Sequence, residues 1–325
     1  MGVGRLIDKL FGGGKRSATL RAYGKLPMYA EYRRLEVAPG APTAFTQWMD
    51  EGRLAWVRSP AKSTTGVTRA SRLLIGLPGT KEAVVASVWE SRDSLGRTFP
   101  FAFFIVCPRE VLGRDAIEHW AAAIDVYHAF DHLYAQLHAL GSGGDFYRFY
   151  QGHTIALRPE DLAERTRALR DQAAQIAAER WLKALTLDGD VTPAMWSAGV
   201  LQRARRWRAQ PASLADAAVS CPLARGFPYD HQIVVWLEWF SGLCEKTGKT
   251  PWLIAPTGTE RSAPSLSLVM RDLLPDDYQL LTSDDRSYSF VEHLSALPAD
   301  TDVTVESIVV PPAGALLAWL RQHTE

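Results

Sequence analysis

The most informative stretch of the sequence is AVVASVWESRDSLGRTFPFAFFIV, residues 83–106. Its two ends, 83–89 and 99–106, are apolar and have the β-branched and aromatic content and the length of buried strands. The polar residues between them include Asp93 and Gly96, which favour a tight turn. The stretch therefore predicts two neighbouring antiparallel strands joined by that turn.

Other segments extend this pair along the chain. Strand-like composition recurs at 19–24, 72–77, 252–255 and 265–270, with further candidates at 288–290 and 303–310. Apolar side chains at helical spacing mark 44–58, 114–140, 159–185, 193–208, 230–246 and 313–322. The predicted fold class is mixed α/β (α+β), with a central, largely antiparallel sheet flanked by helices and an additional helical segment in the middle of the chain.

Composition divides the 325 residues into three parts. Residues 1–18 are expected to be a flexible or amphipathic N-terminal segment, because apolar residues on one helical face precede three glycines. Residues 19–142 are expected to form an N-terminal α/β domain that ends in a glycine-rich linker or helix stop. Residues 145–325 form the C-terminal α/β region, helical at first, with 145–230 as a candidate insertion.

The charge balance argues against a nucleic-acid partner. Thirty-six basic residues match thirty-six acidic ones, so no overall field attracts phosphates. The basic run from Arg203 to Arg208 contains Trp207 and is interpreted as a solvated helix face with a buried tryptophan, since one short run offers few phosphate contacts.

The apolar runs and the cysteines indicate a cytoplasmic protein. No run reaches the roughly 20 residues of a membrane-spanning helix, so stable membrane insertion is not expected. The cysteines are odd in number, lack CxxC spacing and lie in or beside apolar segments: Cys107, Cys221 and Cys244. They are expected to be reduced core residues.

The best catalytic candidate is a pair of histidines one helical turn apart. His128 and His132 lie near Asp125 and Asp131, but the glutamate of an HExxH metal site is missing and no third ligand is evident. Solvated histidines are the preferred interpretation, with a partner contact or a metal-dependent hydrolase as weaker ones. We expect no metal, no cofactor and no catalytic residues.

Three motifs carry a family resemblance. The first is Gly24-Lys25-Leu26-Pro27, followed by Ala30-Glu31-Tyr32-Arg33-Arg34 and Trp48. The second is Ser91, Asp93, Gly96-Arg97 and Phe99-Pro100. The third is Thr257-Gly258-Thr259-Glu260-Arg261, followed by Pro264-Ser265-Leu266, Arg271 and Leu274-Pro275.

Together these motifs resemble the TagF/ImpM family of type VI secretion-associated proteins. The resemblance touches both ends of residues 20–285 and leaves about 145–230 without a recognised motif. Ala30, Glu31 and Tyr32 stand where the family usually has Gly, Asp and Phe.

The residues of the second motif have a structural interpretation of their own. Gly96 can supply the positive φ of a tight turn, and Asp93 can cap the turn or pair with Arg97. Phe99 is expected in the core, and Pro100 limits pairing at the start of the strand. Gly24 and Pro27 are assigned the same kind of structural role.

Four charged residues are the candidates for a partner-binding face. Lys25, Glu31, Arg33 and Arg34 are expected to be exposed, either as this face or as ordinary solvated surface.

The resemblance implies a cytoplasmic, non-enzymatic accessory protein of the type VI secretion system. It would be a post-translational regulator, acting as a repressor of assembly by binding a forkhead-associated scaffold protein. The alternative is a structural adaptor that binds membrane-complex or sheath subunits. The sign of regulation, the direct partner and the oligomeric state stay open at this point.

Overall fold

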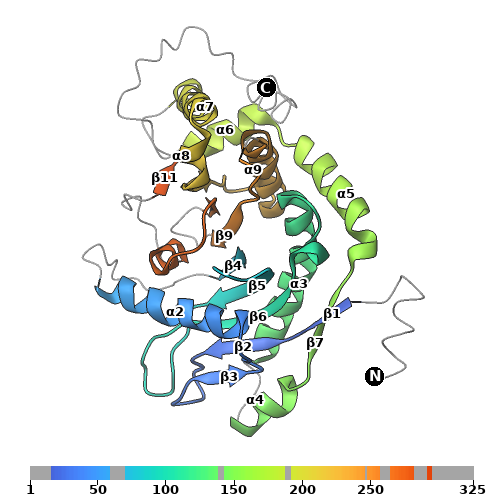
Figure 1. Cartoon of the computed structure of the whole chain (residues 1–325), viewed down its shortest axis with the longest axis vertical. Helices are drawn as coiled ribbons and strands as arrows, with labels where there is room; N and C mark the ends of the chain where they lie inside the picture. Colours follow the sequence, from blue (N-terminus) through green and yellow to red (C-terminus); the bar gives the residue numbers. More distant parts are fainter. Residues whose placement is uncertain are drawn as a thin grey trace.

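A computed structural model describes residues 16–58, 70–137, 143–186, 192–245, 247–256, 264–281 and 291–294 (Figure 1). Its centre is a nine-stranded sheet in the order β11-β8-β10-β9-β4-β5-β6-β2-β3, in which only the β11–β8 pair is parallel. The chain therefore has the predicted α+β fold with a largely antiparallel sheet flanked by helices. The nine strands are β2 (Arg21–Gly24), β3 (Arg33–Leu35), β4 (Ser71–Gly76), β5 (Glu82–Trp89), β6 (Phe101–Pro108), β8 (Ala218–Pro222), β9 (Trp252–Pro256), β10 (Ser265–Val269) and β11 (Val291–His293).

Helices and a small ribbon surround this sheet. The ribbon pairs β1 (Arg16–Thr19) with β7 (Thr154–Leu157). The α-helices are α2 (Ala41–Arg58), α3 (Ala116–Leu137), α4 (Gly143–Tyr150), α5 (Leu162–Ala174), α6 (Ala178–Thr186), α7 (Pro193–Ala209), α8 (Pro211–Ala215) and α9 (Tyr229–Cys244). The 3₁₀ helices are η1 (Arg109–Leu112), η2 (Pro159–Asp161) and η3 (Pro275–Leu281).

The predicted meander is confirmed by β4, β5 and β6. In the β5–β6 pair, Ala83 lies opposite Cys107 and Trp89 lies opposite Phe101. All residues of β5 from Ala83 to Trp89 are buried. Because successive side chains of a strand point to opposite faces, both faces of the sheet must be covered at this position.

Helices α2 and α3 provide that cover from opposite sides. Phe104 of β6 contacts Phe45 of α2, with ring centroids 4.8 Å apart. The preceding residue, Phe103, points to the other face and contacts Phe130 of α3 at 6.3 Å. The alternation along β6 thus places the meander between two helical layers (Figure 1).

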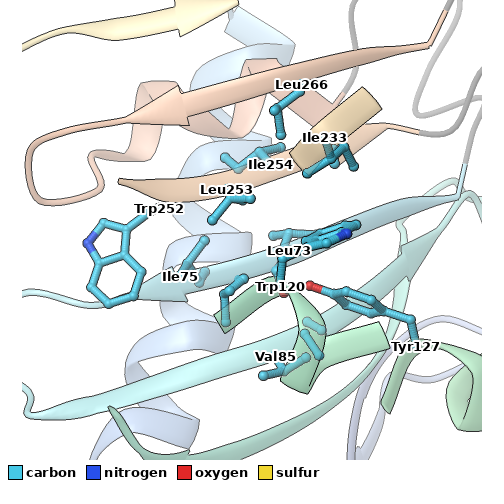
Figure 2. Close-up of a cluster of buried hydrophobic side chains, with 14 of the residues drawn as sticks. Leu73, Ile75, Val85, Trp120, Tyr127, Ile233, Trp252, Leu253, Ile254 and Leu266 are labelled. Atoms are coloured by element: carbon cyan, nitrogen blue, oxygen red, sulfur yellow. Dashed lines mark hydrogen bonds between the residues drawn. The ribbon is translucent and has the colours of Figure 1, made fainter. Parts of the chain in front are cut away.

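The second half of the chain joins the same sheet. β9 pairs with β4, so that Leu73 lies opposite Ile254, and β10 and β8 continue outward. Trp120 and Tyr127 of α3 lie over the β4 region together with Ile233 of α9 (Figure 2). The Tyr127 hydroxyl donates a hydrogen bond to the carbonyl of Leu73 at 2.9 Å, which fixes α3 on the sheet.

The predicted helix over 159–185 is wrong as a single element. The chain forms η2, then α5, then α6, with a break after Ala174. Arg170 of α5 bonds to Glu238 of α9 at 2.6 Å, and Trp181 of α6 donates to Gln232 of α9 at 2.8 Å. Packing against α9 at two places overrides the helical propensity of the intervening residues.

Several short elements were not expected from the sequence: β1, β3, β7, β8, β11, α4 and α8. Residues 16–18 were expected to belong to a flexible or amphipathic segment, but they form β1 because it pairs with β7. Gly143 and Gly144 were interpreted as part of a linker or helix stop but belong to α4. Other expectations lie outside the described residues: the amphipathic face within 1–15, the turn Thr257-Gly258-Thr259-Glu260-Arg261, the strands at 288–290 and 303–310, and the helix at 313–322.

The cysteines are internal, and the basic run is a partly solvated helix face on which Arg205 and Arg206 are exposed. All three cysteines are buried and unpaired, and burial raises the pKa of the Cys107 and Cys244 thiols to about 12. In the basic run, Trp207 is buried as predicted, and Arg203 and Arg206 both form ion pairs with Glu292. Within the described ranges, no helix is long and apolar enough to cross a membrane.

Replacing Gln232 tests how much its hydrogen bonds stabilise the packing of α9 against α6 and residues 224–227. Gln232 is completely buried, accepts from Trp181 Nε1 and Ala224 N, and donates to the carbonyls of Ala224 and Phe227. Gln232→Leu leaves these groups unsatisfied and should lower the free energy of unfolding by about 3 kcal/mol. Urea denaturation measures the change.

The matched control is Gln47→Leu on α2. The Gln47 amide is exposed and bonds to Glu51 one helical turn away. Its replacement should change stability by less than about 0.5 kcal/mol. If the two variants had the same free energy of unfolding, the hydrogen bonds of the buried Gln232 amide would not stabilise the fold.

Candidate functional site

The first and second sequence motifs meet through an ion pair. Lys25 Nζ lies 2.8 Å from Asp93 Oδ2, and the two side chains are 7% and 0% exposed. The sheet explains the meeting, because β2 and β5 lie on either side of β6 and both end opposite Phe101. Lys25 follows the end of β2 and Asp93 follows the end of β5, so the topology brings together residues 68 positions apart.

Asp93 also organises the turn in which it lies. Its Oδ1 accepts from the main-chain N–H groups of Leu95 at 3.0 Å and Arg97 at 2.8 Å. Its Oδ2 accepts from Arg97 Nε at 2.6 Å, which confirms the predicted pairing of Asp93 with Arg97. Gly96 has φ +80°, as predicted for the residue that closes the turn.

Two opposing effects act on the Asp93 carboxyl. Burial alone would raise its pKa, but hydrogen bonds from Lys25, Arg97 and the Leu95 main chain favour the charged form. These bonds prevail and hold the pKa of Asp93 well below its ordinary range. The carboxylate is therefore charged at neutral pH and serves as the centre of the turn.

The turn is fixed to the first motif by main-chain contacts as well. Arg97 Nη2 donates to the carbonyl of Ala30 at 2.5 Å, and Ser94 N donates to the carbonyl of Tyr29 at 2.9 Å. Gly24 has φ +132°, and a Cβ there would collide with the main chain of Pro100. A glycine is thus required at the point where the two motifs cross.

Aromatic packing completes this unit. Phe99 is buried, as predicted, and Tyr32 packs edge-on against it with ring centroids 4.8 Å apart. The strand β6 begins at Phe101, directly after Pro100. We call the unit formed by residues 24–32 and 91–100 the motif junction.

The expected exposure of Lys25 is wrong. The side chain is buried because Asp93 neutralises it inside the motif junction, and the Tyr32 ring lies 5.1 Å from Nζ. A lysine between a glycine and a leucine gives no local sign of burial, and its partner is distant in sequence. The one available signal was the presence of opposite charges in the two motifs.

The other three candidates for the partner face differ from one another. Glu31 and Arg34 are exposed, and the Arg34 guanidinium lies 5.2 Å from the ring of Tyr23. Arg33 is half-buried, with its guanidinium 3.7 Å from the ring of Tyr29. Glu31 and Arg34 are thus available for binding, whereas Arg33 has a packing role.

A recess of about 580 Å³ opens beside the turn. It is a depression that is widely open to solvent and not an enclosed cavity. Sequence reasoning missed two contributors, Glu90 and Tyr134, which stand outside the motifs; Tyr134 comes from α3 and stacks on Trp89 at 4.1 Å. The lining residues are Pro27, Glu90, Ser91, Arg92, Asp93, Ser94, Gly96 and Tyr134.

A second hollow of about 710 Å³ lies at the opposite end of β5 and β6. Its polar lining carries both signs of charge, and its five charged residues are Arg109, Lys249, Arg271, Asp216 and Asp272. Arg271 is engaged by the buried Asp277 at 2.6 Å, and the Arg109 guanidinium stacks over Trp252 at 4.5 Å. Charges of both signs leave this hollow without a clear preference for one class of ligand.

The fold brings no further potential metal ligands to the pair His128 and His132, within the residues that the structure describes. Asp125 forms an ion pair with Arg165 at 2.6 Å, and Asp131 forms one with Arg72 at 3.5 Å. His132 Nε2 lies 2.9 Å from the amide nitrogen of Gln136. Among the residues whose positions are described, no three His, Cys, Asp or Glu side chains gather as a metal site would require.

Replacing Asp93 should destabilise the protein by isolating Lys25. Asp93→Asn keeps the size of the side chain but leaves a buried cation unpaired, and we expect the melting temperature to fall by roughly 5 °C. Adding Lys25→Met removes that cation and should recover part of the loss. A double variant less stable than Asp93→Asn alone would contradict the ion-pair account. Thermal denaturation provides the measurement.

The Asp93 carboxylate should make the free energy of unfolding depend on pH in the acidic range. Because its folded pKa is depressed, its contribution is complete above the ordinary unfolded pKa of about 4 and is lost as the pH falls through the folded value. The gap in urea midpoint between the native chain and Asp93→Asn should therefore narrow from pH 6 to pH 3. A constant gap would show that Asp93 is not ionised in the folded state.

The chain is similar to known proteins among the solved structures. No known family model matches the chain, and no curated protein matches it. Among solved structures, the chain is similar to PA0076 from Pseudomonas aeruginosa PAO1, with 18% sequence identity and a TM-score of 0.31. The alignment covers 46% of this chain and 78% of PA0076.

Proposed function

We propose that this protein is a TagF/ImpM-like accessory protein of the type VI secretion system. It acts in the cytoplasm, without catalysis, as a post-translational repressor of assembly, and it does so by binding a forkhead-associated scaffold protein. The proposal rests on the sequence resemblance, and the motif junction is the structural observation that supports it.

The support comes from the contacts that residues of the first two motifs make with each other. The first two motifs contribute the ion pair between Lys25 and Asp93, the bond from Arg97 to Ala30 and the glycine crossing at Gly24. These residues thus all have a structural role in one unit, the motif junction.

The departure from the usual motif is compatible with this unit. Ala30 stands in place of glycine, but among the described residues only Glu36 is a non-glycine residue with positive φ. Ala30 therefore needs no conformation reserved for glycine, and its carbonyl still receives the bond from Arg97. Tyr32 replaces phenylalanine and keeps the aromatic contact with Phe99.

A binding role requires an exposed surface at the junction. Glu31 and Arg34 lie on it with opposite charges, and Arg97 has a half-exposed side chain. Mixed charges around apolar groups are typical of the rim of a protein interface. The proposal therefore places the partner on the face that carries residues 31–34.

Binding is tested by calorimetry with the purified 325-residue chain and the forkhead-associated scaffold protein of the same bacterium. We expect a complex, and we expect the double variant Glu31→Gln, Arg34→Gln to bind about ten-fold more weakly. This variant keeps the net charge at zero, so a loss reports on the local face and not on the overall field. Its melting temperature should match that of the native chain.

Two outcomes would contradict the proposal. Absence of binding at micromolar concentrations would remove the scaffold as the partner. Stoichiometric co-purification with membrane-complex or sheath subunits, with type VI secretion unchanged on deletion, would favour the structural adaptor instead.

A further inference from the structure

The face that carries residues 31–34 overlaps β3, the outermost strand at one end of the sheet (Figure 1). β3 has three residues and pairs within the sheet with β2, so few main-chain hydrogen bonds hold it in place. Glu36, the residue directly after β3, has φ +53°. A residue with a side chain keeps this conformation only where surrounding contacts impose it. The shape of this face therefore depends on side-chain contacts.

One buried tyrosine supports two exposed side chains of this face. Tyr23 of β2 is 1% exposed and lies directly opposite Arg34 in the β2–β3 pair. Its ring stacks on that of Tyr32, with centroids 5.7 Å apart, and the Arg34 guanidinium lies 5.2 Å from the centroid of the Tyr23 ring. Tyr32 and Arg34 are both exposed. The position of the Tyr23 ring thus determines where these two side chains stand.

Asp50 of α2 holds the hydroxyl end of that ring. The Tyr23 hydroxyl donates to the Asp50 carboxylate, with the two carboxylate oxygens 2.7 and 2.8 Å away. Burial and this carboxylate raise the pKa of Tyr23 well above its ordinary value, so the hydroxyl keeps its proton and stays a donor. Burial also raises the pKa of Asp50, and the charge of Arg34 acts in the opposite direction, so the two side chains attract each other.

The bond between Tyr23 and Asp50 gives orientation more than apolar contact. A phenylalanine would bury the same ring without taking a carboxylate partly out of water. A satisfied polar pair instead fixes the ring in one position. Helix α2 is a firm base for this bond, because Phe45 packs on Phe104 of β6. A surface held in one shape loses little conformational freedom when it binds, which favours recognition.

We infer that Asp50 is a positioning residue for the partner. Through Tyr23, it holds Tyr32 and Arg34 in the arrangement that the forkhead-associated scaffold protein binds, and it acts without contacting the scaffold itself. This inference rests on the proposed function, because the scaffold is the partner named there.

Amide hydrogen exchange of the free 325-residue chain tests the positioning without the scaffold. Tyr23→Phe keeps the ring and removes the hydroxyl, and it should speed exchange at residues 31–35 about five-fold, the factor expected for one lost hydrogen bond. Asp50→Ala should give a similar factor, and the two changes together should give no more, because both break the same bond. Exchange in Tyr23→Phe within roughly two-fold of that in the native chain would overturn the inference.

Tyr127→Phe is the matched control for both measurements. It removes a buried hydroxyl that bonds to the carbonyl of Leu73 from α3, on the other face of the sheet. It should leave exchange at residues 31–35 within roughly two-fold of the native value. A general loss of stability would speed exchange at residues 31–35 in both tyrosine variants, whereas loss of positioning affects Tyr23→Phe alone.

Calorimetry with the purified scaffold tests whether this positioning matters for binding. Tyr23→Phe should weaken binding about five-fold, and Tyr127→Phe should bind within roughly two-fold of the native chain. In a chain that already carries Tyr32→Ala and Arg34→Gln, adding Tyr23→Phe should weaken binding by less than about two-fold, because Tyr23 acts through these side chains.

The outcomes separate this inference from the proposed function. If the native chain fails to bind the scaffold, the proposed function is overturned and the inference falls with it. If the native chain binds and Tyr23→Phe binds equally well, the proposed function stands and the inference is wrong. An undiminished loss from Tyr23→Phe in the chain with Tyr32→Ala and Arg34→Gln would show that Tyr23 acts by another route, and it would also overturn the inference.

Discussion

Burial of both faces of β5 and β6 is the constraint on which the rest of the structure depends. Both faces of these strands carry valine, alanine and phenylalanine. Because neither face can be exposed to water without a large cost, a helical layer covers each of them. Phe104 meets α2 on one side and Phe103 meets α3 on the other. Between these two helical layers β2 and β5 flank β6, and the ends of both strands converge on Phe101.

The motif junction is a consequence of that convergence. Lys25 and Asp93 each follow a strand that ends beside Phe101, and they neutralise each other where neither can reach water. The pair holds a surface turn in one shape, which is a gain in specificity more than in stability.

The sequence predicted the parts of this arrangement that depend on local pattern. The meander, the α2, α3 and α9 helices and the roles of Gly96, Arg97 and Phe99 all follow from periodicity or turn chemistry. The missed parts depend on distant partners. β8 is five residues with no clear alternation and is a strand because β10 pairs with it, and Lys25 is buried because of a residue 68 positions away. Tyr134 lines the recess from α3, and no local pattern connects it with the turn.

The pairing of β4 with β9 also determines the order in which the sheet can be completed. β4 ends at Gly76 and β9 begins at Trp252, so about 175 residues must be synthesised after β4 before its second edge finds a partner. At about 5–20 residues per second, the ribosome needs roughly 10 to 35 s to supply them. During this interval an apolar strand has an open edge, the feature that promotes pairing between chains. The pairing of β4 with β9 therefore closes an apolar edge that stays open through more than half of the synthesis of the chain.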